Sequence, residues 1–359
     1  MMDIEGDKII VPKRDVILIS GYYGFDNAGD EAVLSSISDM IKTEINGAKI
    51  AALSNNPEKT ARENGITTVQ RNDMKAVIKL LRRTKVFISG GGSLFQDVTG
   101  KNSVIYYGGM IHLARLFGAK VMVMSQGLGP LNGGFTKFMT KIAINRAKTV
   151  TWRDKESMNL AKSIGIKEKK MRLSCDPVLM WKPNLEDIQV GRLINGKKTA
   201  VCVRSWKGLD ESILTDTIQA LTEQDHKILL IPFQKGTDEE IAKRIAEVTD
   251  AEKAKVTENW ARTVYKLIGQ SDLVIGMRLH SLIMAAACGK STIAVSYDPK
   301  VDAFCEENKI PIACKAESFD ADKILEAAEN ASDEPIVSVA DIKERWQISV
   351  DELKCLWEL

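Results

Sequence analysis

The chain has 359 residues, a net charge of +2, and 44% hydrophobic and 27% charged residues, values typical of a globular protein. Since this length exceeds one ordinary hydrophobic core, we expect two domains of roughly 150–180 residues each. With 50 basic and 48 acidic residues, the chain lacks the strong basic excess that is typical of a dedicated nucleic-acid binder.

In the first half of the chain, short apolar runs of strand length alternate with segments of helical length. The expected strands lie at 15–21, 49–54, 85–90, 120–126, 149–154 and 171–177. The expected helices begin near residue 30 and after residue 54, and cover 74–83, 103–118, 135–148 and 155–164. This alternation is typical of a parallel, doubly wound α/β sheet.

A proline- and glycine-bearing segment, residues 177–196, separates this half from a second one with the same alternation. We expect further strands at 198–204, 227–233, 272–276, 291–296 and 310–314. Helices are expected at 209–223, 237–248, 258–270, 281–289, 301–308, 320–330 and 339–357. The organisation predicted is an N-terminal Rossmann-like domain (13–180), a C-terminal one (190–338) and a C-terminal helix (339–359). The two domains would face each other across a cleft, where ligands meet the carboxyl ends of the strands.

The junction between the strand at 272–276 and the following helix places Arg278 and His280 side by side. Helix N-termini present unpaired N–H groups and a positive dipole end, so an anionic group is favoured there. A guanidinium and a titratable imidazole add charge-assisted donors. The alternative is that His280 only caps the helix and Arg278 is a surface ion-pair partner.

Two glycine-containing loops follow strands of the first half. In GYYGFDNAGDEA (21–32), Asp30 is placed to cap the next helix, whereas Asp26 and Asn27 are candidates for binding sugar hydroxyl groups. In GGGSLFQD (90–97), the polar side chains suited to a neutral polyhydroxylated ligand are Ser93, Gln96 and Asp97. For the second loop, the alternative is a tight turn whose polar side chains bind no ligand.

Three further basic residues stand directly after strands, namely Arg153, Arg204 and Lys300. Arg153 and Arg204 could each bind an anion in the cleft or belong to a structural ion pair, and Lys300 could bind an anion or be a solvated surface residue. No cluster of His, Cys, Asp or Glu has zinc spacing, no carboxylate pair indicates magnesium, and no Walker loop is present. Metal-dependent and nucleotide-triphosphate chemistry is therefore not expected.

Six cysteines without CxxC spacing, several in apolar runs, indicate reduced core thiols. The start of the chain has acidic residues and no apolar signal-peptide segment, and no apolar run approaches the ~20 residues that cross a bilayer. We expect a cytoplasmic protein. No amphipathic basic stripe that would dock it to a membrane is evident in the sequence.

The motifs GYYGFDNAGDEA, GGGSLFQD, SQGLGP, TWRD, CDPV and GMRLHSLIMAAACG, spread in this order over most of residues 15–300, resemble those of polysaccharide pyruvyl transferases, in particular the CsaB type. The resemblance implies a GT-B-like fold and transfer of pyruvate from phosphoenolpyruvate, a co-substrate, to a sugar as a 4,6-ketal, with no cofactor. For the CsaB type it implies N-acetylmannosamine of a lipid-linked secondary cell-wall polymer precursor as acceptor, at the inner face of the membrane. The finished polymer would retain S-layer-homology proteins at the cell surface.

The resemblance also implies roles for individual residues. It assigns catalysis to His280 and Arg278. It assigns donor binding to Arg204, Arg278, Leu279, His280 and Lys300 of the C-terminal domain and to Arg153 of the N-terminal domain. The polar residues of the two glycine-containing loops are then the candidates for binding the acceptor in the N-terminal domain, namely Asp26, Asn27, Ser93, Gln96 and Asp97. With an unperturbed pKa of ~6.5, His280 could act as general acid toward the enol carbon or the leaving phosphate. The base for the sugar hydroxyl is not identifiable from the sequence.

Two other function classes remain open at this point. A nucleotide-sugar glycosyltransferase of similar architecture would need an acidic ribose contact at a strand end of the C-terminal half, and we find no such carboxylate beside Arg278. A non-enzymatic sugar- or nucleotide-binding module would hold its ligand without turnover. The clustering of cations with a histidine at one predicted rim disfavours the binding module.

Overall fold

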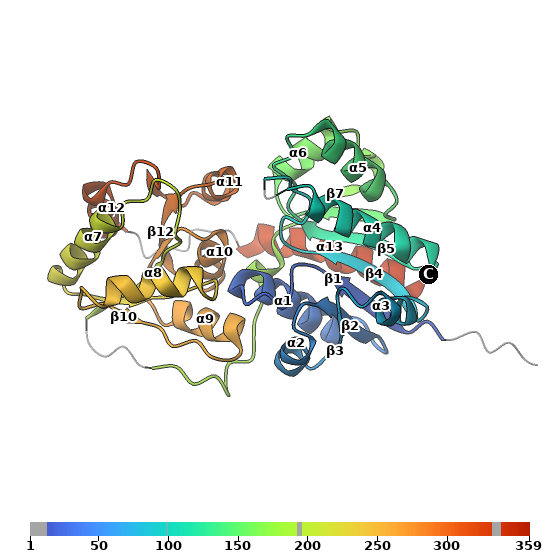
Figure 1. The fold of residues 1–359 in the computed structure, drawn as a ribbon, viewed down its shortest axis with the longest axis horizontal. Coiled ribbons are helices and arrows are strands. Elements are labelled where there is room, and N and C mark those ends of the chain that lie inside the picture. Colours follow the sequence, from blue (N-terminus) through green and yellow to red (C-terminus); the bar gives the residue numbers. More distant parts are fainter. Residues whose placement is uncertain (1–12, 99, 192–195, 332–338) are drawn as a thin grey trace, which may run out of the picture.

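The structure is a computed structural model that describes residues 13–98, 100–191, 196–331 and 339–359. Figure 1 shows two lobes side by side, the first built from the blue and green part of the chain and the second from the yellow and orange part. Within the described residues no helix combines the length and apolar composition that crossing a bilayer requires.

The first lobe is built on a sheet whose strands are all parallel. Its described strands are β1 (Val16–Ser20), β2 (Lys49–Ser54), β3 (Thr67–Gln70), β4 (Thr84–Gly90), β5 (Lys120–Gln126), β6 (Thr149–Trp152) and β7 (Met171–Leu173). They lie in the order β3-β2-β1-β4-β5-β6-β7. Its helices are α1 (Ala28–Glu44), α2 (Pro57–Asn64), α3 (Met74–Leu81), α4 (Asn102–Leu116), α5 (Gly134–Asn145) and α6 (Lys155–Ser163), followed by the 3-10 turns η1 (Glu168–Lys170) and η2 (Pro177–Met180).

The second lobe repeats this plan with a smaller parallel sheet. Its described strands are β8 (Lys197–Cys202), β9 (His226–Leu230), β10 (Glu252–Lys253), β11 (Leu273–Gly276), β12 (Ser291–Ser296) and β13 (Ile312–Lys315). Their order is β10-β9-β8-β11-β12-β13. The helices are α7 (Glu211–Glu223), α8 (Thr237–Ala246), α9 (Trp260–Gly269), α10 (Leu279–Ala287), α11 (Pro299–Asn308) and α12 (Ala321–Glu329), and the chain ends in α13 (Val339–Glu358).

The strand order reverses between β1 and β4 in the first lobe and between β8 and β11 in the second. In open parallel sheets, ligands bind outside the carboxyl ends of the strands at such a reversal. The predicted α/β fold with two Rossmann-like lobes is therefore confirmed, and both reversals lie where the sequence places candidate site residues.

The sequence pattern did not reveal β3 and β10. Strand β3 is an edge strand of four residues, none of them fully buried, so it lacks the apolar run that marks an interior strand. Strand β10 has only two residues. Periodicity cannot identify elements this short.

One apolar core runs through both lobes, because the helices that face the junction are buried on several sides. Helix α1 packs against α9 and the turn η2, and α10 packs against η2 as well. The buried side chains of this shared core include Val33, Leu34, Ile37 and Ile41 from α1 and Trp260, Val264 and Ile268 from α9. The lobes are thus joined by continuous packing rather than by a loose linker.

The last helix, α13, returns from the second lobe to the first, where Figure 1 shows it in red. The Ser349 hydroxyl donates to Thr151 Oγ1 on β6 at 2.8 Å, and Lys120 on β5 donates to the carbonyl of Leu356 at 3.1 Å. Arg345 donates to the Ser174 carbonyl at 2.8 Å and pairs with Glu307 of α11 at 2.7 Å. The C-terminal helix therefore fastens the two lobes together.

Replacing Ile37 by Ala tests the shared core. Ile37 is fully buried, and its loss should lower the free energy of unfolding by about 2–5 kcal/mol, as measured by urea denaturation. Ile213→Ala, on the surface of α7 at 36% exposure, is the control and should cost less than about 1 kcal/mol. Equal, small losses for both variants would contradict a core that spans α1.

Candidate active site

A cleft of about 1500 Å³, part of it open to solvent, lies between the lobes. Its walls come from the segments that follow β1, β4, β5 and β6 in the first lobe and β8, β9, β11 and β12 in the second. The predicted site residues that line it are Asn27, Ser93, Gln96, Arg153, Arg204, Arg278, Leu279, His280 and Lys300. The structure therefore brings together every predicted donor-site residue.

Helix α10 begins at the cleft directly after β11. Arg278 occupies the N-cap position in extended backbone conformation and makes no side-chain capping hydrogen bond. The Ser281 N–H donates to the Arg278 carbonyl at 2.9 Å, so the N–H groups of Leu279 and His280 are the ones left to water or a ligand, at the positive end of the helix dipole. The predicted anion-favouring junction is present, and the alternative that His280 caps this helix is wrong because it lies inside the helix.

His280 is enclosed at the junction of the two lobes. Its Nε2 atom lies 3.7 Å from Oδ2 of Asp176, and neither atom has a hydrogen-bond partner among the described residues. On the other side the ring lies against Gly29, where a Cβ atom would stand 2.3 Å from Nδ1. Only glycine at position 29 leaves room for this imidazole, so His280 is positioned by both lobes.

Burial lowers the pKa of His280 to about 4. The charges of Arg153, Lys300 and Arg278 lower this pKa further, while Asp176 opposes them. The imidazole is therefore neutral at neutral pH, and the unperturbed pKa expected from the sequence is wrong for the ligand-free protein. A bound anion would offset the surrounding cations and raise the pKa again.

Arg204 projects into the cleft without a carboxylate partner among the described residues. Its guanidinium donates to the Tyr297 hydroxyl at 2.8 Å and lies over the rings of Trp206 and Tyr297 at 5.1 and 4.9 Å. Stacking on rings orients a guanidinium without neutralising its charge. Arg204 is thus a fixed positive charge available to an anionic ligand.

The other three cations of the cleft each have a carboxylate beside them. Arg278 makes a two-point ion pair with the buried Asp238, with distances of 3.0 and 2.5 Å. Lys300 pairs with Asp298 at 3.2 Å. The prediction that no carboxylate lies beside Arg278 is therefore wrong, because Asp238 is distant in sequence but adjacent in the fold. Since Asp238 is completely buried, it fixes the guanidinium and is closed to a ribose in the cleft.

Arg153 lies almost entirely below the surface, with 6% of its side chain exposed. It donates to Asp154 at 3.1 Å and to the Ser93 hydroxyl at 3.2 Å, and its Nη1 lies 3.6 Å from Asp176. Asp176, from the CDPV motif, therefore stands between Arg153 and His280. We did not single out Asp176 from the sequence, although its motif was among those that indicated the family.

The predicted role of Asp30 as the cap of α1 is wrong. Asn27, not Asp30, caps α1, because its side chain accepts from the N–H groups of Gly29 and Asp30 at 3.0 and 3.3 Å. Asp30 instead lines the cleft, where its carboxylate has no hydrogen-bond partner among the described residues. Burial raises its pKa to about 7, against the opposing charges of Lys300, Arg153 and Arg278. A carboxyl group with this pKa can accept or donate a proton near neutrality.

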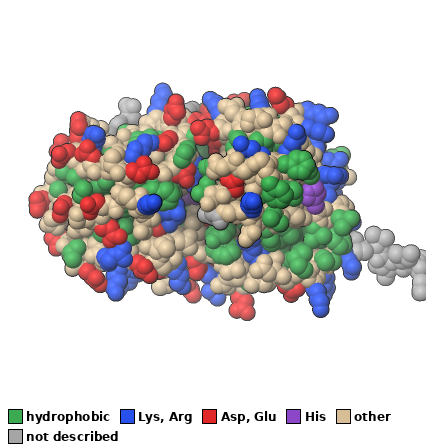
Figure 2. Space-filling view, turned by 45° about the horizontal axis from the view of Figure 1, so that its top comes forward, with side chains coloured by type: hydrophobic (Ala, Val, Ile, Leu, Met, Phe, Trp, Pro, Cys, Tyr) green, Lys and Arg blue, Asp and Glu red, His purple; other side chains and the backbone are tan. Residues whose placement is uncertain are grey.

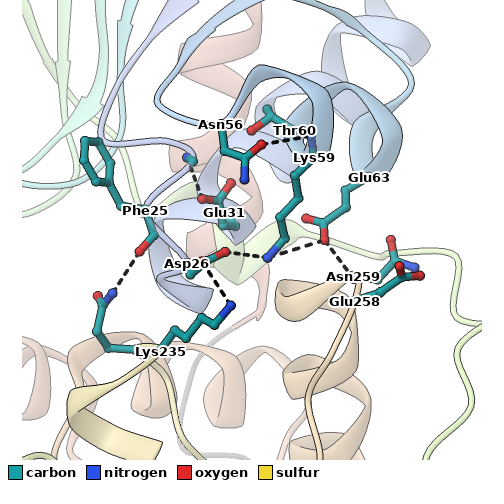
Figure 3. A network of polar contacts seen from close by, with 12 residues as sticks. Phe25, Asp26, Glu31, Asn56, Lys59, Thr60, Glu63, Lys235, Glu258 and Asn259 are labelled. Atoms are coloured by element: carbon teal, nitrogen blue, oxygen red, sulfur yellow. Dashed lines mark hydrogen bonds and ion pairs between the residues drawn. The ribbon is translucent and has the colours of Figure 1, made fainter. Parts of the chain in front are cut away.

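Asp26 does not belong to the cleft lining. Figure 3 shows it directed toward Lys59, at 2.5 Å, and toward Lys235 of the second lobe, at 3.9 Å. The neighbouring carbonyl of Phe25 accepts from Gln234, also in the second lobe, at 2.9 Å. Asp26 therefore joins the lobes, and its predicted contact with sugar hydroxyl groups has no support in its position.

Asp97 is also engaged away from the cleft lining. Its carboxylate accepts from the N–H groups of Asn132 and Gly133 at 2.9 and 2.8 Å, and from the Thr136 hydroxyl at 2.6 Å. These bonds lower the pKa of Asp97 against the effect of burial. Asp97 anchors the loop before α5, so the predicted sugar contact is not favoured here either.

A pair of stacked aromatic side chains, not predicted from the sequence, borders the first-lobe side of the cleft. Tyr22, which lines the cleft and is 41% exposed, stacks on Phe25 with ring centroids 4.0 Å apart and an interplanar angle of 6°. Arg71 lies over the Phe25 ring at 5.3 Å. Exposed aromatic faces of this kind can pack against the apolar face of a sugar ring.

The family comparison indicates the same family as the motifs. The model of the family described as polysaccharide pyruvyl transferase matches residues 27–299. No curated protein matches the chain in sequence. Across the described residues, no group of three or more His, Cys, Asp or Glu side chains is arranged to hold a metal ion.

Solved structures share the fold at low sequence identity. Anabaena Alr3699/HepE in complex with UDP-glucose is 13% identical, with a TM-score of 0.60 over 95% of this chain and 99% of that one. UDP-GlcNAc 2-epimerase from Methanocaldococcus jannaschii is 12% identical, with a TM-score of 0.64 over 94% and 99% of the two chains. The corresponding Neisseria meningitidis epimerase bound to UDP-GlcNAc is 11% identical, with a TM-score of 0.60 over 94% and 99%. The predicted GT-B-like fold is confirmed.

Replacing Asp30 by Asn should stabilise the protein in a pH-dependent way. Because the folded-state pKa of about 7 exceeds the ordinary value of 3.8, ionisation of Asp30 favours unfolding as pH rises from about 4 to 7. Asp30→Asn should therefore raise the free energy of unfolding by about 1–3 kcal/mol at pH 8, and the gain should vanish near pH 4. Denaturation across this pH range, with the exposed Asp216→Asn as control, measures it. A gain independent of pH would contradict the buried ionisation.

Proposed function

The chain belongs to the polysaccharide pyruvyl transferase family, and on this premise we propose that it moves the pyruvate unit of phosphoenolpyruvate onto a sugar as a cyclic ketal, with release of phosphate. The observation that supports this most is the convergence of Arg153, Arg204, Arg278 and Lys300 on one cleft together with the neutral His280. Phosphoenolpyruvate bears a carboxylate and a phosphate on adjoining atoms, which makes it a compact, highly charged anion near neutral pH.

The donor would occupy the second-lobe side of the cleft. Arg204, which lacks a carboxylate partner among the described residues, can hold the donor carboxylate or phosphate through paired N–H donors. The N-terminus of α10, from Leu279 onward, supplies main-chain donors to the other anionic group. Lys300 stands across the same cleft and adds a movable positive charge.

The acceptor would enter along the first lobe. Tyr22 offers a ring face for a sugar, and Asn27, Ser93 and Gln96 lie along the same wall with polar side chains. Asp30 stands on this wall beside Gly29, which contacts the His280 ring. A sugar held here would present its hydroxyl groups to a donor bound near His280 and Arg204.

The reaction divides into two additions at the same carbon. Protonation of the donor methylene makes the central carbon electrophilic, and one sugar hydroxyl adds there while losing its proton. The carbon–oxygen bond to phosphate then breaks, phosphate leaves with the bonding electron pair, and a second hydroxyl closes the ketal with loss of its own proton. The cations stabilise the charge that gathers on the leaving phosphate.

Two groups of the cleft can handle these protons. Asp30, with a pKa of about 7, is ionised in part of the molecules at neutral pH and can accept the proton of the attacking hydroxyl. His280 becomes a general acid once the bound donor offsets the surrounding cations and raises its pKa above about 4. Asp176 would stabilise the imidazolium formed at that stage.

The proposed acceptor rests on the resemblance of the motifs to the CsaB type. We infer that the enzyme is of the CsaB type and forms a 4,6-ketal on N-acetylmannosamine of a lipid-linked precursor of a secondary cell-wall polymer, which later retains S-layer-homology proteins. Such a precursor is exposed at the inner face of the membrane, so the enzyme would work there, in the cytoplasm. No cofactor is required, because phosphoenolpyruvate itself supplies the transferred unit and the leaving group.

The alternative function is that of a nucleotide-sugar glycosyltransferase, because the similar Anabaena structure contains UDP-glucose. The carboxylate nearest to Arg278 is the buried Asp238, whose oxygens are both used by that guanidinium. The family membership also favours pyruvyl transfer.

The test is to incubate the protein with a soluble N-acetylmannosamine-containing acceptor and either phosphoenolpyruvate or UDP-sugars. Pyruvyl transfer predicts release of inorganic phosphate and a product whose mass gain equals one pyruvate less one water. Release of UDP with a mass gain of one sugar would instead identify a glycosyltransferase.

Replacing His280 by Gln should slow phosphate release by at least ~100-fold, because the ring that supplies the proton is lost. Single-turnover phosphate release measures the step directly. His112→Gln, on the outer side of α4, is the matched control and should leave the rate unchanged. A near-normal rate for His280→Gln would remove the imidazole from proton transfer.

Replacing Arg204 by Gln should raise the KM for phosphoenolpyruvate by about 10–100-fold, the usual loss when a hydrogen bond to a charged group disappears. The effect on kcat should be smaller, because ground-state binding is what is removed. Arg244→Gln, which breaks a surface ion pair with Glu211 on the same lobe, is the control. An unchanged KM would place the donor elsewhere.

A further inference from the structure

One stretch of the first lobe has a charge composition unlike the rest of the chain. Between Asp97 and Asp154 the chain contains no Asp or Glu, but eight Lys or Arg residues, although acidic and basic residues are almost equal in number overall. This stretch forms α4, β5, α5 and β6. Of the eight, Arg115, Lys137 and Lys141 lie on α4 and α5, and Lys101 and Arg146 directly flank these helices.

The same two helices expose large apolar side chains. On α4 these are Ile105 and Leu116, at 49% and 79% exposure, and on α5 they are Phe135 and Phe138, at 51% and 58%. Helices α4 and α5 pack side by side. Figure 2 shows hydrophobic side chains gathered on this lobe beside a histidine, with Lys and Arg side chains around them. We call this surface the α4–α5 face, defined by Ile105, Leu116, Phe135 and Phe138.

Basic side chains lie directly against these apolar ones. Lys101 Nζ stands 5.9 Å from the centre of the Phe135 ring, and burial, together with the nearby charge of Arg146, lowers the pKa of His112 on α4. Lys137 and Lys141 alternate with the two phenylalanines along α5. None of the basic residues named here has an ion-pair partner in the part of the chain that the structure describes.

The α4–α5 face adjoins the mouth of the cleft. Helix α4 presents Ser103 and Tyr107 to the cleft, while Ile105, between them in sequence, is exposed on the outside. Val98, at 64% exposure, lies on the cleft lining just before α4. Phe135 is in the first turn of α5 and Ile105 in the first turn of α4, so these two apolar side chains lie at the helix ends nearest the site, whereas Leu116 lies at the far end of α4.

We propose that the α4–α5 face docks the protein onto the surface of an anionic phospholipid bilayer, with the phenylalanines entering the headgroup region and the lysines and arginines facing the lipid phosphates. Apolar side chains ringed by basic ones match a bilayer surface, which is apolar inside and negatively charged outside. A nucleic acid would match the charge but not the exposed phenylalanines. The sequence did not reveal this face, because it is assembled from two helices, each of which exposes only a few large apolar side chains.

Docking in this orientation would place the cleft mouth close to the bilayer. The proposal deepens the proposed function, since a sugar linked to a membrane lipid could then reach the cleft without leaving the membrane. Bilayer binding itself requires neither donor nor acceptor, so it can succeed or fail separately from pyruvyl transfer.

Cosedimentation of the full chain with vesicles tests the proposal. The protein should bind vesicles of phosphatidylglycerol and phosphatidylcholine at least about ten-fold more tightly than pure phosphatidylcholine vesicles, and added salt should weaken the binding. Phe135→Ser/Phe138→Ser and Lys101→Glu/Lys137→Glu should each reduce binding to the anionic vesicles by about ten-fold or more. Ile213→Ser/Val248→Ser, at exposed sites of the second lobe, should bind like the wild type.

Two further measurements keep the test decisive. Circular dichroism and thermal melting establish that each variant is folded, and turnover with a soluble acceptor should be unchanged in the Phe135→Ser/Phe138→Ser variant. Equal binding to neutral and anionic vesicles, or no binding at all, would overturn the proposal. So would a concentration-dependent dimer in sedimentation velocity that the Phe135→Ser/Phe138→Ser change abolishes, since the face would then be a contact between copies of the chain.

Discussion

The site depends on an electrostatic constraint, namely that burial and the cationic side chains nearby both disfavour the charged form of the His280 imidazole. Arg153, Lys300 and Arg278 all lower the pKa of His280, and Asp176 alone among the named groups raises it. Arg204 adds a further cation, whose guanidinium lies over the rings of Trp206 and Tyr297. Such an arrangement raises the free energy of the ligand-free protein, and binding of an anion lowers it. The donor chemistry and the proton transfers we propose both follow from this arrangement.

The same constraint explains why the two lobes are packed rather than loosely joined. His280 belongs to the second lobe, but the groups that enclose it, Gly29 and Asp176, belong to the first. The inter-lobe network around Asp26 and the return of α13 to the first lobe hold these groups in register. In this view, residues far from the cleft contribute to the chemistry by keeping the imidazole buried.

The sequence revealed the parts of this site that are local in the chain. Arg204, Arg278 and His280 follow apolar strands, and parallel sheets collect such positions at one edge, so their convergence could be predicted. Asp176 and Asp238 could not be assigned in this way, because their partners are distant in sequence and only tertiary packing brings them together. Asp30 was misread for a different reason. Asn and Asp are nearly equivalent caps, so the start of α1 at Asn27 or at Asp30 was not decided by propensity. The α4–α5 face escaped notice because each helix alone exposes only a few apolar side chains.

Calorimetric titration of the protein with phosphoenolpyruvate, in two buffers of different ionisation enthalpy at the same pH, tests the central claim most directly. If the bound donor offsets the cations around His280 and Asp30, binding should be accompanied by net proton uptake at pH values slightly above neutral, and His280→Gln should reduce that uptake. Binding without proton uptake, or uptake that is the same in the His280→Gln variant, would contradict the account.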